Sequence, residues 1–227
     1  MSPVTETAPW SELAAQYAAV LEHRAVGGAS LRAALTAYIA QYPSSPNRAD
    51  AFIALGDLEL AAYDGNPAPL AEARSFYWNA LGIAKGRTLL DAAYKLGRVD
   101  VLRGDYDEAI KAFKNAAAAD ADKSVESAIL RDRALRDLAG AFAFTGTPNE
   151  AYPLFAQITL DEETIRMMLV ELAQGYDRLG KDPERRSVYD ELRRRDPKNG
   201  CQWTVRYRHA APNADPATLE ADLAKCR

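Results

Sequence analysis

Apolar and small residues recur along the chain with the spacing of amphipathic helices, and short polar turns separate these segments into pairs. The clearest pair lies within residues 93–120, where the turn Gly104–Tyr106 divides two helical segments. Gly104 stands where the first helix must end, at a position that favours a left-handed φ. The small and apolar positions of this pair are Leu96, Gly97, Ala109, Phe113 and Ala116.

The same arrangement recurs in residues 135–158 and 169–197, around the turn glycines Gly146 and Gly180. These two glycines are 34 residues apart, whereas Gly146 follows the previous turn glycine by 42 residues. The surplus of eight residues fits the polar stretch 120–126, which we predict to be a longer loop between repeats.

Three further pairs are less regular. One begins at Ala49 and has a long turn over residues 64–69, and the other two lie near the ends of the chain. Gln202–Arg208 alternates like a strand, but we favour a helix there. The sequence therefore predicts an all-α fold of about six helical hairpins, or about twelve helices. The terminal helices are expected at Trp10–Arg24, Ser30–Tyr42, Gln202–Ala210 and Ala217–Lys225.

We expect one continuous α-solenoid domain over residues 1–227, in which each hairpin buries its apolar face on its neighbours. Residues 1–9 are expected to be a flexible N-terminus, and residues 199–227 an irregular hairpin that caps the stack. The stretch 120–126 is then a hinge between repeats and not a domain boundary.

The hairpin within residues 93–120 resembles the tetratricopeptide repeat, a helix–turn–helix unit of about 34 residues. Its small and apolar positions match those of the family on both helices, and only the usual closing proline is replaced, by Ala121. The resemblance implies a right-handed superhelix that binds proteins or peptides. The unit at 169–197 departs from it at Arg185, where a small residue is expected; we predict a loosened helix pair or a side chain that extends to solvent.

The segment Gln41–Asp57 reads QYPSSPNRADAFIALGD and resembles a linker common in bacterial envelope proteins of this family. Those proteins include the lipoprotein of the outer-membrane assembly machine and the periplasmic cell-division coordinator. Pro43 and Pro46 stop one helix and redirect the chain. Residues Ala128–Ile158 are also similar to the large periplasmic tetratricopeptide proteins of myxobacterial gliding-motility complexes. These resemblances imply a protein of the cell envelope.

Charge and hydropathy narrow the classes of function. The formal net charge is −4, which disfavours a general nucleic-acid binder or a binder of anionic membranes, because both need a basic field. No stretch approaches the roughly 18 uncharged apolar residues of a membrane span. The first ten residues lack the basic segment and apolar run of a signal peptide, so we expect a cytoplasmic protein or the mature form of an exported one.

We predict no catalytic centre, no cofactor and no metal site. The two histidines, His23 and His209, are far apart in the sequence, and no phosphate loop, nucleophile elbow, His-Glu-x-x-His or dinucleotide motif is present. The acidic residues 161–163 precede a predicted helix, where their charge suits the positive end of the helix dipole better than it suits a metal.

Cys201 and Cys226 lie early on the first helix and late on the second helix of the last predicted hairpin. Antiparallel helices bring such positions opposite each other, within the Cα separation that a disulfide needs. A disulfide would imply an oxidising compartment. The alternative is two unlinked buried thiols, and a zinc site with His209 would lack a fourth ligand.

In the tetratricopeptide family, the first helices of successive repeats line the inner, concave groove. This frame places a basic stripe on that face of an otherwise acidic protein, suited to an acidic peptide or a terminal carboxylate. The paired asparagines of chaperone-binding members are absent, and the alternative is solvated arginines paired with neighbouring aspartates. The expected partner-binding residues are Tyr94, Lys95, Arg98, Val101, Arg133, Arg136 and Gln174. The same frame also turns Val170 inward.

The expected function is therefore a non-enzymatic scaffold or adaptor in a periplasmic complex of outer-membrane assembly, division or gliding motility. We expect a protein or peptide partner, no nucleic acid and no transmembrane segment. The alternatives are a cytoplasmic, co-chaperone-like peptide-binding adaptor and a repeat domain attached to an enzyme that is not in this chain.

Overall fold

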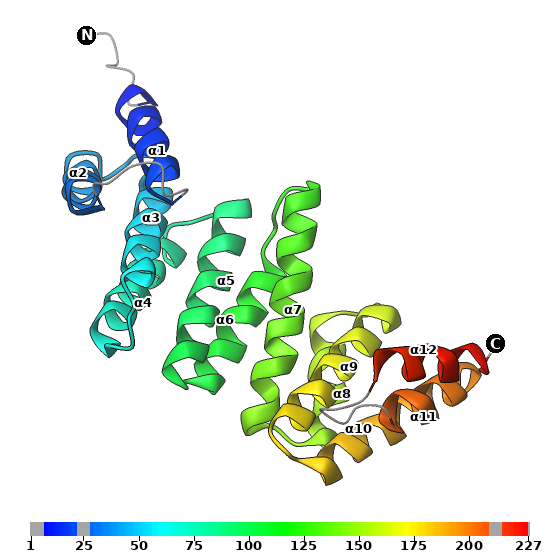
Figure 1. The fold of residues 1–227 in the computed structure, drawn as a ribbon. Helices are drawn as coiled ribbons and strands as arrows, with labels where there is room; N and C mark the ends of the chain where they lie inside the picture. The colour runs from blue at the N-terminus through cyan, green and yellow to red at the C-terminus, as the bar shows by residue number, and fades with distance from the viewer. Residues whose placement is uncertain (1–6, 22–27, 209–214, 227) are drawn as a thin grey trace. The chain divides into compact units, whose positions relative to one another are not determined.

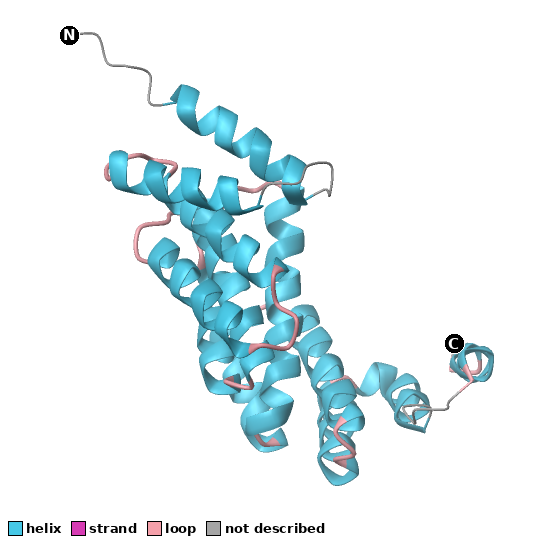
Figure 2. Cartoon of the chain, turned by 60° about the vertical axis from the view of Figure 1, so that its left-hand side comes forward, coloured by secondary structure: helices cyan, strands magenta, loops and turns pink. Residues whose placement is uncertain are grey.

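The computed structural model describes residues 7–21, 28–208 and 215–226. These residues form twelve α-helices and one 3₁₀ turn, and no strand occurs among them (Figures 1 and 2). The predicted all-α fold of twelve helices is thus confirmed, and Gln202–Arg208 is helical. The predicted flexible N-terminus is described only from Thr7, where the first helix begins. Both histidines and the predicted helix ends at Arg24 and Ala210 lie outside the described residues.

Backbone contacts divide the chain into two compact units, each described here by itself. Unit 1 comprises Met1–Asp105 and Ala119–Leu130. Within it each helix contacts the next, and α3 also contacts α5, as expected for stacked helical hairpins. Its complete helices are α1 (Thr7–Leu21), α2 (Gly28–Gln41), α3 (Arg48–Ala61), α4 (Pro67–Leu81) and α5 (Gly86–Arg103).

Unit 2 comprises Tyr106–Ala118 and Arg131–Arg227. Here α8 contacts both α6 and α10, so alternate helices again meet as in an α-solenoid. Its helices are α6 (Tyr106–Ala118), α7 (Val125–Thr145, which begins in unit 1), α8 (Pro148–Ile158), α9 (Glu162–Arg178), α10 (Asp182–Arg195), the 3₁₀ turn η1 (Pro197–Asn199), α11 (Gly200–Arg208) and α12 (Pro216–Ala224).

Small residues set the distance between packed helices in both units. A Cβ atom on Gly56 of α3 would lie 2.5 Å from the ring of Tyr77 of α4, which is fully buried. In unit 2, a Cβ atom on Gly175 of α9 would lie 2.7 Å from the Cβ of Ala143 of α7. Separations below 3.0 Å do not occur between real Cβ atoms and their neighbours, so only glycine fits at these two points.

The predicted turn glycines serve two different purposes. Gly104 and Gly180 adopt left-handed φ angles of 81° and 69°. Each glycine ends its helix, and the residue after it donates a backbone hydrogen bond to a carbonyl of the last turn. The bonds run from Asp105 N to Asp100 O and from Lys181 N to Tyr176 O, both at 2.9 Å. Gly146 instead has no room for a side chain, because a Cβ atom there would meet the ring of the preceding turn's Phe142.

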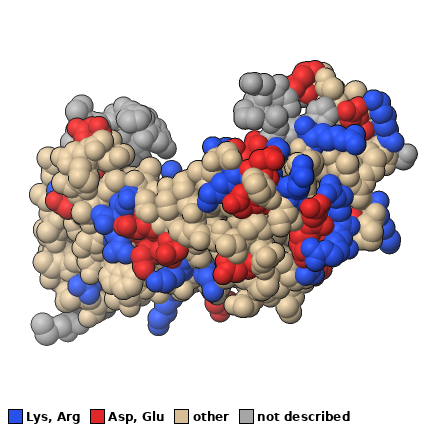
Figure 3. Space-filling model, turned by 90° about the horizontal axis from the view of Figure 1, so that it is seen from below, with Lys and Arg blue, Asp and Glu red and all other residues tan. Residues whose placement is uncertain are grey.

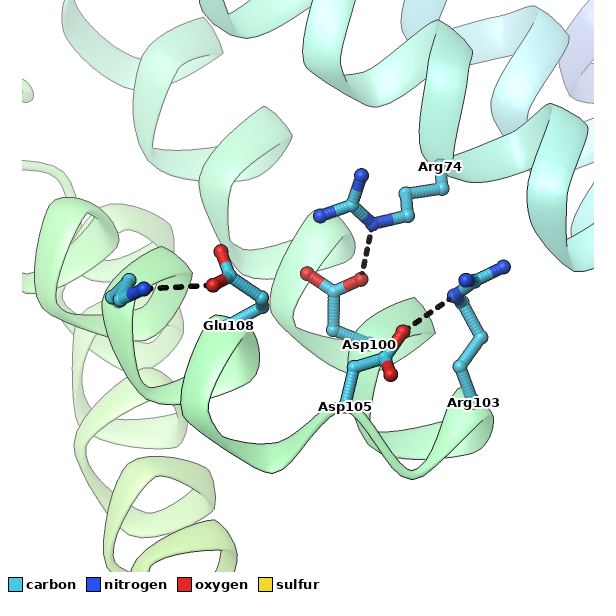
Figure 4. A network of polar contacts seen from close by, with 6 residues as sticks. Arg74, Asp100, Arg103, Asp105 and Glu108 are labelled. Atoms are coloured by element: carbon cyan, nitrogen blue, oxygen red, sulfur yellow. Dashed lines mark hydrogen bonds and ion pairs between the residues drawn. The ribbon is translucent and has the colours of Figure 1, made fainter.

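The C-terminal end of α5 is also fixed by ion pairs in unit 1. Arg74 of α4 donates from Nε to Asp100 Oδ1 at 2.6 Å, and Asp100 is almost fully buried (Figure 4). Arg103 pairs with Asp105 at 2.8 Å just beyond the helix end (Figure 4). A buried carboxylate is tolerated only with such partners, so these contacts tie α4 to the end of α5.

Two predicted loops are shorter than the sequence indicated. Residues 67–69 were expected in a turn, but α4 already begins at Pro67, because proline is preorganised for the first helical position. Asn66 caps this helix by accepting a hydrogen bond from Ala68 N at 3.1 Å.

The loop before α7 covers residues 119–124 and is held by Asp122, whose pKa falls to about 2 through hydrogen bonds from Ser124. Part of the surplus length therefore extends α7.

Arg185 contradicts the prediction of an outward-pointing side chain. Its relative exposure is only 9%, and its guanidinium is held by Asp177 at 3.0 Å and by Asp182. The same group lies over the ring of Tyr207, 5.0 Å from its centroid. Two carboxylates and an aromatic face compensate the burial of the charge, so the helix pair α9–α10 packs without a small residue there.

Cys201 and Cys226 form a disulfide between α11 and the end of α12, with Cα atoms 5.6 Å apart. The predicted pairing of these cysteines is therefore confirmed. No side chain of α12 is fully buried among those described, and the described contacts of this helix are with α11. The covalent link is thus the main restraint on the last helix.

The close approach at Gly56 predicts a stability effect with a clear sign. Gly56→Ala is expected to lower the free energy of unfolding by about 1–3 kcal/mol, because the Tyr77 ring is enclosed and cannot move away. Gly140→Ala is the matched control, since a Cβ atom there meets nothing within 4 Å. That substitution is expected to stabilise α7 by about 0.5–1 kcal/mol. Urea unfolding followed by circular dichroism checks both, and an equal effect of the two variants would contradict the packing argument.

The disulfide predicts that protein isolated without reductant shows no free thiol after denaturation. The link closes a loop with a sequence separation of 25 residues, and its loss in Cys201→Ser/Cys226→Ser is expected to destabilise the last hairpin by about 3 kcal/mol. Hydrogen exchange should accelerate in α11 and α12 and stay unchanged in α3 and α4. Two titratable thiols in the unreduced, denatured chain would contradict the pairing.

Candidate functional site

Unit 2 contains a groove of about 370 Å³ on the side formed by α7, α9 and α11. These are the first helices of successive hairpins, which is where the concave face was expected. The lining combines three arginines and two carboxylates with an indole, a thioether and a valine. Its residues are Arg136, Glu163, Arg166, Met167, Val170, Asp196, Asn199, Gln202, Trp203 and Arg206.

Helix α9 supplies four of these side chains at helical spacing. Glu163, Arg166, Met167 and Val170 recur at intervals of three and four residues and so share one face. The helix is anchored at its start by Asp161, whose carboxylate accepts a hydrogen bond from Thr164 N at 3.0 Å. The acidic residues before this helix thus include its N-cap, as the dipole interpretation predicted.

The three arginines of the groove differ in how their charge is compensated. Arg136 pairs with Asp132 at 2.8 Å and with Glu171 at 2.7 Å. Arg166 has a single distant partner, Asp196, at 4.0 Å. Arg206 has no carboxylate within ion-pair distance among the described residues. Arg206 is therefore the least compensated arginine of the groove, and the other acidic side chains nearby are Glu163, which lines the groove, and Glu220, which lines an adjoining pocket with Arg206.

Asp196 lines the groove, and its carboxylate accepts hydrogen bonds from neighbouring side chains. Its carboxylate accepts hydrogen bonds from Asn199 Nδ2 at 2.9 Å and from Trp203 Nε1 at 3.3 Å. The bonds from Asn199 lower the pKa of Asp196, so it remains ionised. These bonds position the indole of Trp203 in the wall, and the ionised carboxylate lies 4.0 Å from Arg166.

Of the residues predicted for the concave face, Arg136 lines this groove, as does Val170, which the repeat frame also turned inward. Arg133 and Gln174 are exposed but do not line it. Arg133 has no ion-pair partner within the described part of the chain. Arg136 is paired with a neighbouring aspartate, as the alternative interpretation of the basic stripe expected.

The other predicted residues lie on α5 in unit 1. Arg98 is exposed, and no carboxylate of the described residues is within ion-pair distance of it. Tyr94 and Val101 are half-buried. Lys95 donates to Asp57 Oδ2 at 2.6 Å and lies 3.2 Å from Asp91 Oδ2. Its charge is compensated within the unit, so it is not a free cation for a partner.

Asp57 is the centre of a polar network that joins four helices of unit 1. Besides the bond from Lys95 of α5, it accepts hydrogen bonds from the hydroxyls of Tyr17 of α1 and Tyr77 of α4, the latter at 2.6 Å. Burial, helped by the charge of Asp57, raises the pKa of both tyrosines well above 10.0. Burial alone would lower the pKa of Lys95, but Asp57 and Asp91 raise it above 10.5.

Sequence reasoning placed Val170 of α9 on the inner face but missed Met167 and the part of the wall formed by α11. Met167 follows Arg133 by 34 residues, so projecting the repeat length from the predicted stripe would have found it as well. The contribution of Trp203 and α11 had no such signal, because the hairpin that contains them departs from the repeat pattern. The alternating sequence of Gln202–Arg208 also did not indicate which face of α11 would point inward.

The groove is one part of a surface on which opposite charges are mixed. On the face shown in Figure 3, basic and acidic side chains lie interspersed. Among the described residues, no group of three or more His, Cys, Asp or Glu side chains is arranged to hold a metal ion. None of the described helices combines the length and apolar character that crossing a bilayer requires.

Comparison with protein-family models, curated proteins and solved structures gives no match.

The Asp57 network predicts a loss of stability at alkaline pH. Tyr17, Tyr77 and Lys95 all have folded-state pKa values above their ordinary ones, so the unfolded chain releases these protons first. Their contribution to stability is complete below about pH 10 and is lost as the pH rises further. Urea unfolding between pH 8 and 11 should show this decline, with a smaller slope in Tyr17→Phe. The exposed Tyr63→Phe serves as control, and an identical slope in Tyr17→Phe and the wild type would contradict the assignment.

Proposed function

We propose that the protein is a non-enzymatic interaction scaffold that binds an acidic segment of a partner protein in the groove of unit 2. The observation that supports this most directly is the side-chain set of the groove. Guanidinium groups from three successive first helices lie beside Trp203 and Met167 in one concavity. Arginine and tryptophan are the residue types that contribute most to protein interfaces, because they combine a large apolar surface with directed hydrogen bonds.

The charge pattern supports an acidic partner segment. Arg206 lacks a carboxylate partner among the described residues, and the Asp196 partner of Arg166 is engaged by Asn199 and Trp203. A ligand carboxylate would gain charge-assisted hydrogen bonds without displacing a strong ion pair. An aromatic or aliphatic side chain next to that carboxylate would pack against Trp203 and Val170.

We further propose that this scaffold belongs to a complex of the bacterial cell envelope. The disulfide between Cys201 and Cys226 fits an oxidising compartment. The linker at Gln41–Asp57 resembles that of envelope tetratricopeptide proteins, which assemble outer-membrane, division or motility machinery. Both features point to the periplasm, and free thiols in the native protein would favour the cytoplasmic adaptor instead.

The groove predicts that charge reversal on α11 weakens the binding of an acidic probe. A fluorescein-labelled peptide of alternating glutamate and phenylalanine, titrated against the full chain, should lose about tenfold in affinity in Arg206→Glu. Arg166→Glu is expected to have a similar effect, since Arg166 lines the same groove and its only ion-pair partner among the described residues is 4.0 Å away. Fluorescence anisotropy at two salt concentrations measures both.

Arg178→Glu is the matched control for this experiment. Arg178 is exposed at the end of α9 and does not line the groove, so the same change of net charge there should alter the affinity by less than about twofold. Equal weakening in all three variants would show that the peptide responds to overall charge, and the groove would then be excluded as the binding surface.

A further inference from the structure

A second concavity lies in unit 1, where the loop between α2 and α3 meets the loop between α4 and α5. It has a volume of about 430 Å³. The packing of α4 against both α3 and α5 brings these two loops together. Pro43, Ser44 and Arg48 form one wall, and Ile83 and Lys85 form the other. None of these residues belongs to the groove of unit 2 or to the expected concave face.

The pocket is positively charged and has no internal compensation. Arg48 and Lys85 are its only charged lining residues, and neither has a carboxylate within ion-pair distance in the described part of the chain. The Arg48 guanidinium lies over the ring of Phe52, 5.5 Å from its centroid, which restricts its orientation. The Nε atom of Arg48 is buried and has no hydrogen-bond acceptor.

Asp50 of the first turn of α3 does not line the pocket, and its carboxylate accepts a hydrogen bond from the hydroxyl of Thr88 at 3.2 Å. Neither Asn47 nor Lys85 caps its helix with a side chain, so the first turns of α3 and α5 leave backbone donors beside the two cations. The rest of the lining combines three hydroxyl side chains with apolar ones, and Ile83 is 44% exposed.

We propose that this pocket binds a small ligand that carries an oxyanion, a phosphate monoester or a carboxylate, on an apolar body. The planar fork of Arg48 and the ammonium group of Lys85 hold the oxyanion, because both are unpaired and one is fixed by Phe52. The apolar body packs against Pro43, Pro46 and Ile83. This site is independent of the proposed groove in unit 2.

Amide chemical-shift titrations of the full chain test the proposal with four probes. Phenyl phosphate or benzoate should shift the amides of Ser44, Arg48, Ile83 and Thr88, and the one that saturates at lower concentration identifies the oxyanion. Inorganic phosphate should bind at least about fivefold more weakly because it lacks the apolar body. Phenol should cause no saturable shift. A phenol response equal to that of phenyl phosphate, or no response to either aromatic anion, overturns the proposal.

Variants separate this pocket from general electrostatic attraction. Arg48→Gln and Lys85→Gln should each weaken the binding of the preferred anion by about tenfold, and Arg48→Lys should lie between Arg48→Gln and the wild type. Arg87→Gln is the control, because Arg87 is exposed next to the pocket but does not line it. Thermal melts confirm folding, and Lys85→Gln carries the test if Arg48→Gln is unstable. Equal weakening in Arg87→Gln and Lys85→Gln overturns the proposal.

Discussion

The helices of both units can stack only where one of two facing residues is small. Gly56 lets the ring of Tyr77 lie directly against the backbone of α3, and Gly175 does the same for Ala143 of α7. In a solenoid each helix packs only on near neighbours, so no distant element can compensate for a badly fitted contact. The approach at Gly56 has a second effect: it brings the Tyr77 hydroxyl to Asp57, the next residue of α3. Close packing thereby fixes the position of the polar network that joins α1, α3, α4 and α5.

Most of the fold follows from short-range signals in the sequence. The left-handed glycines at 104 and 180 were predictable, because the helix pattern stops there and only glycine suits the required φ. Helix starts were harder, as at Pro67, because a proline-rich segment favours a turn and a first helical turn equally. Arg185 was misassigned because a repeat frame assumes a small residue there. Its charge is paired with Asp177 and Asp182, which shortly precede it in the chain, and its guanidinium lies over the ring of Tyr207.

The candidate site was predictable only where the repeat frame was regular. Arg136 and Val170 occupy equivalent positions of consecutive hairpins, so the frame placed both on the inner face, and both line the groove. Lys95 occupies an inner position as well, but its charge is compensated by Asp57 and Asp91. Ion pairing of this kind depends on the spacing of helices and not on a pattern within one helix. The frame can therefore indicate which face a residue occupies, but not whether its charge is available.

Availability of charge distinguishes the groove from other basic segments of unit 2. The arginines that end α10 have carboxylate partners within the same helix, Arg193 with Asp190 and Arg195 with Glu191, at the three- and four-residue spacings of helix neighbours. Helix α11 contains no acidic residue, so Arg206 has no intrahelical partner. Its charge can be compensated only from another element or from a ligand. Arg206 gives the groove a positive end beside the aromatic wall of Trp203, and this asymmetry would orient the proposed acidic segment.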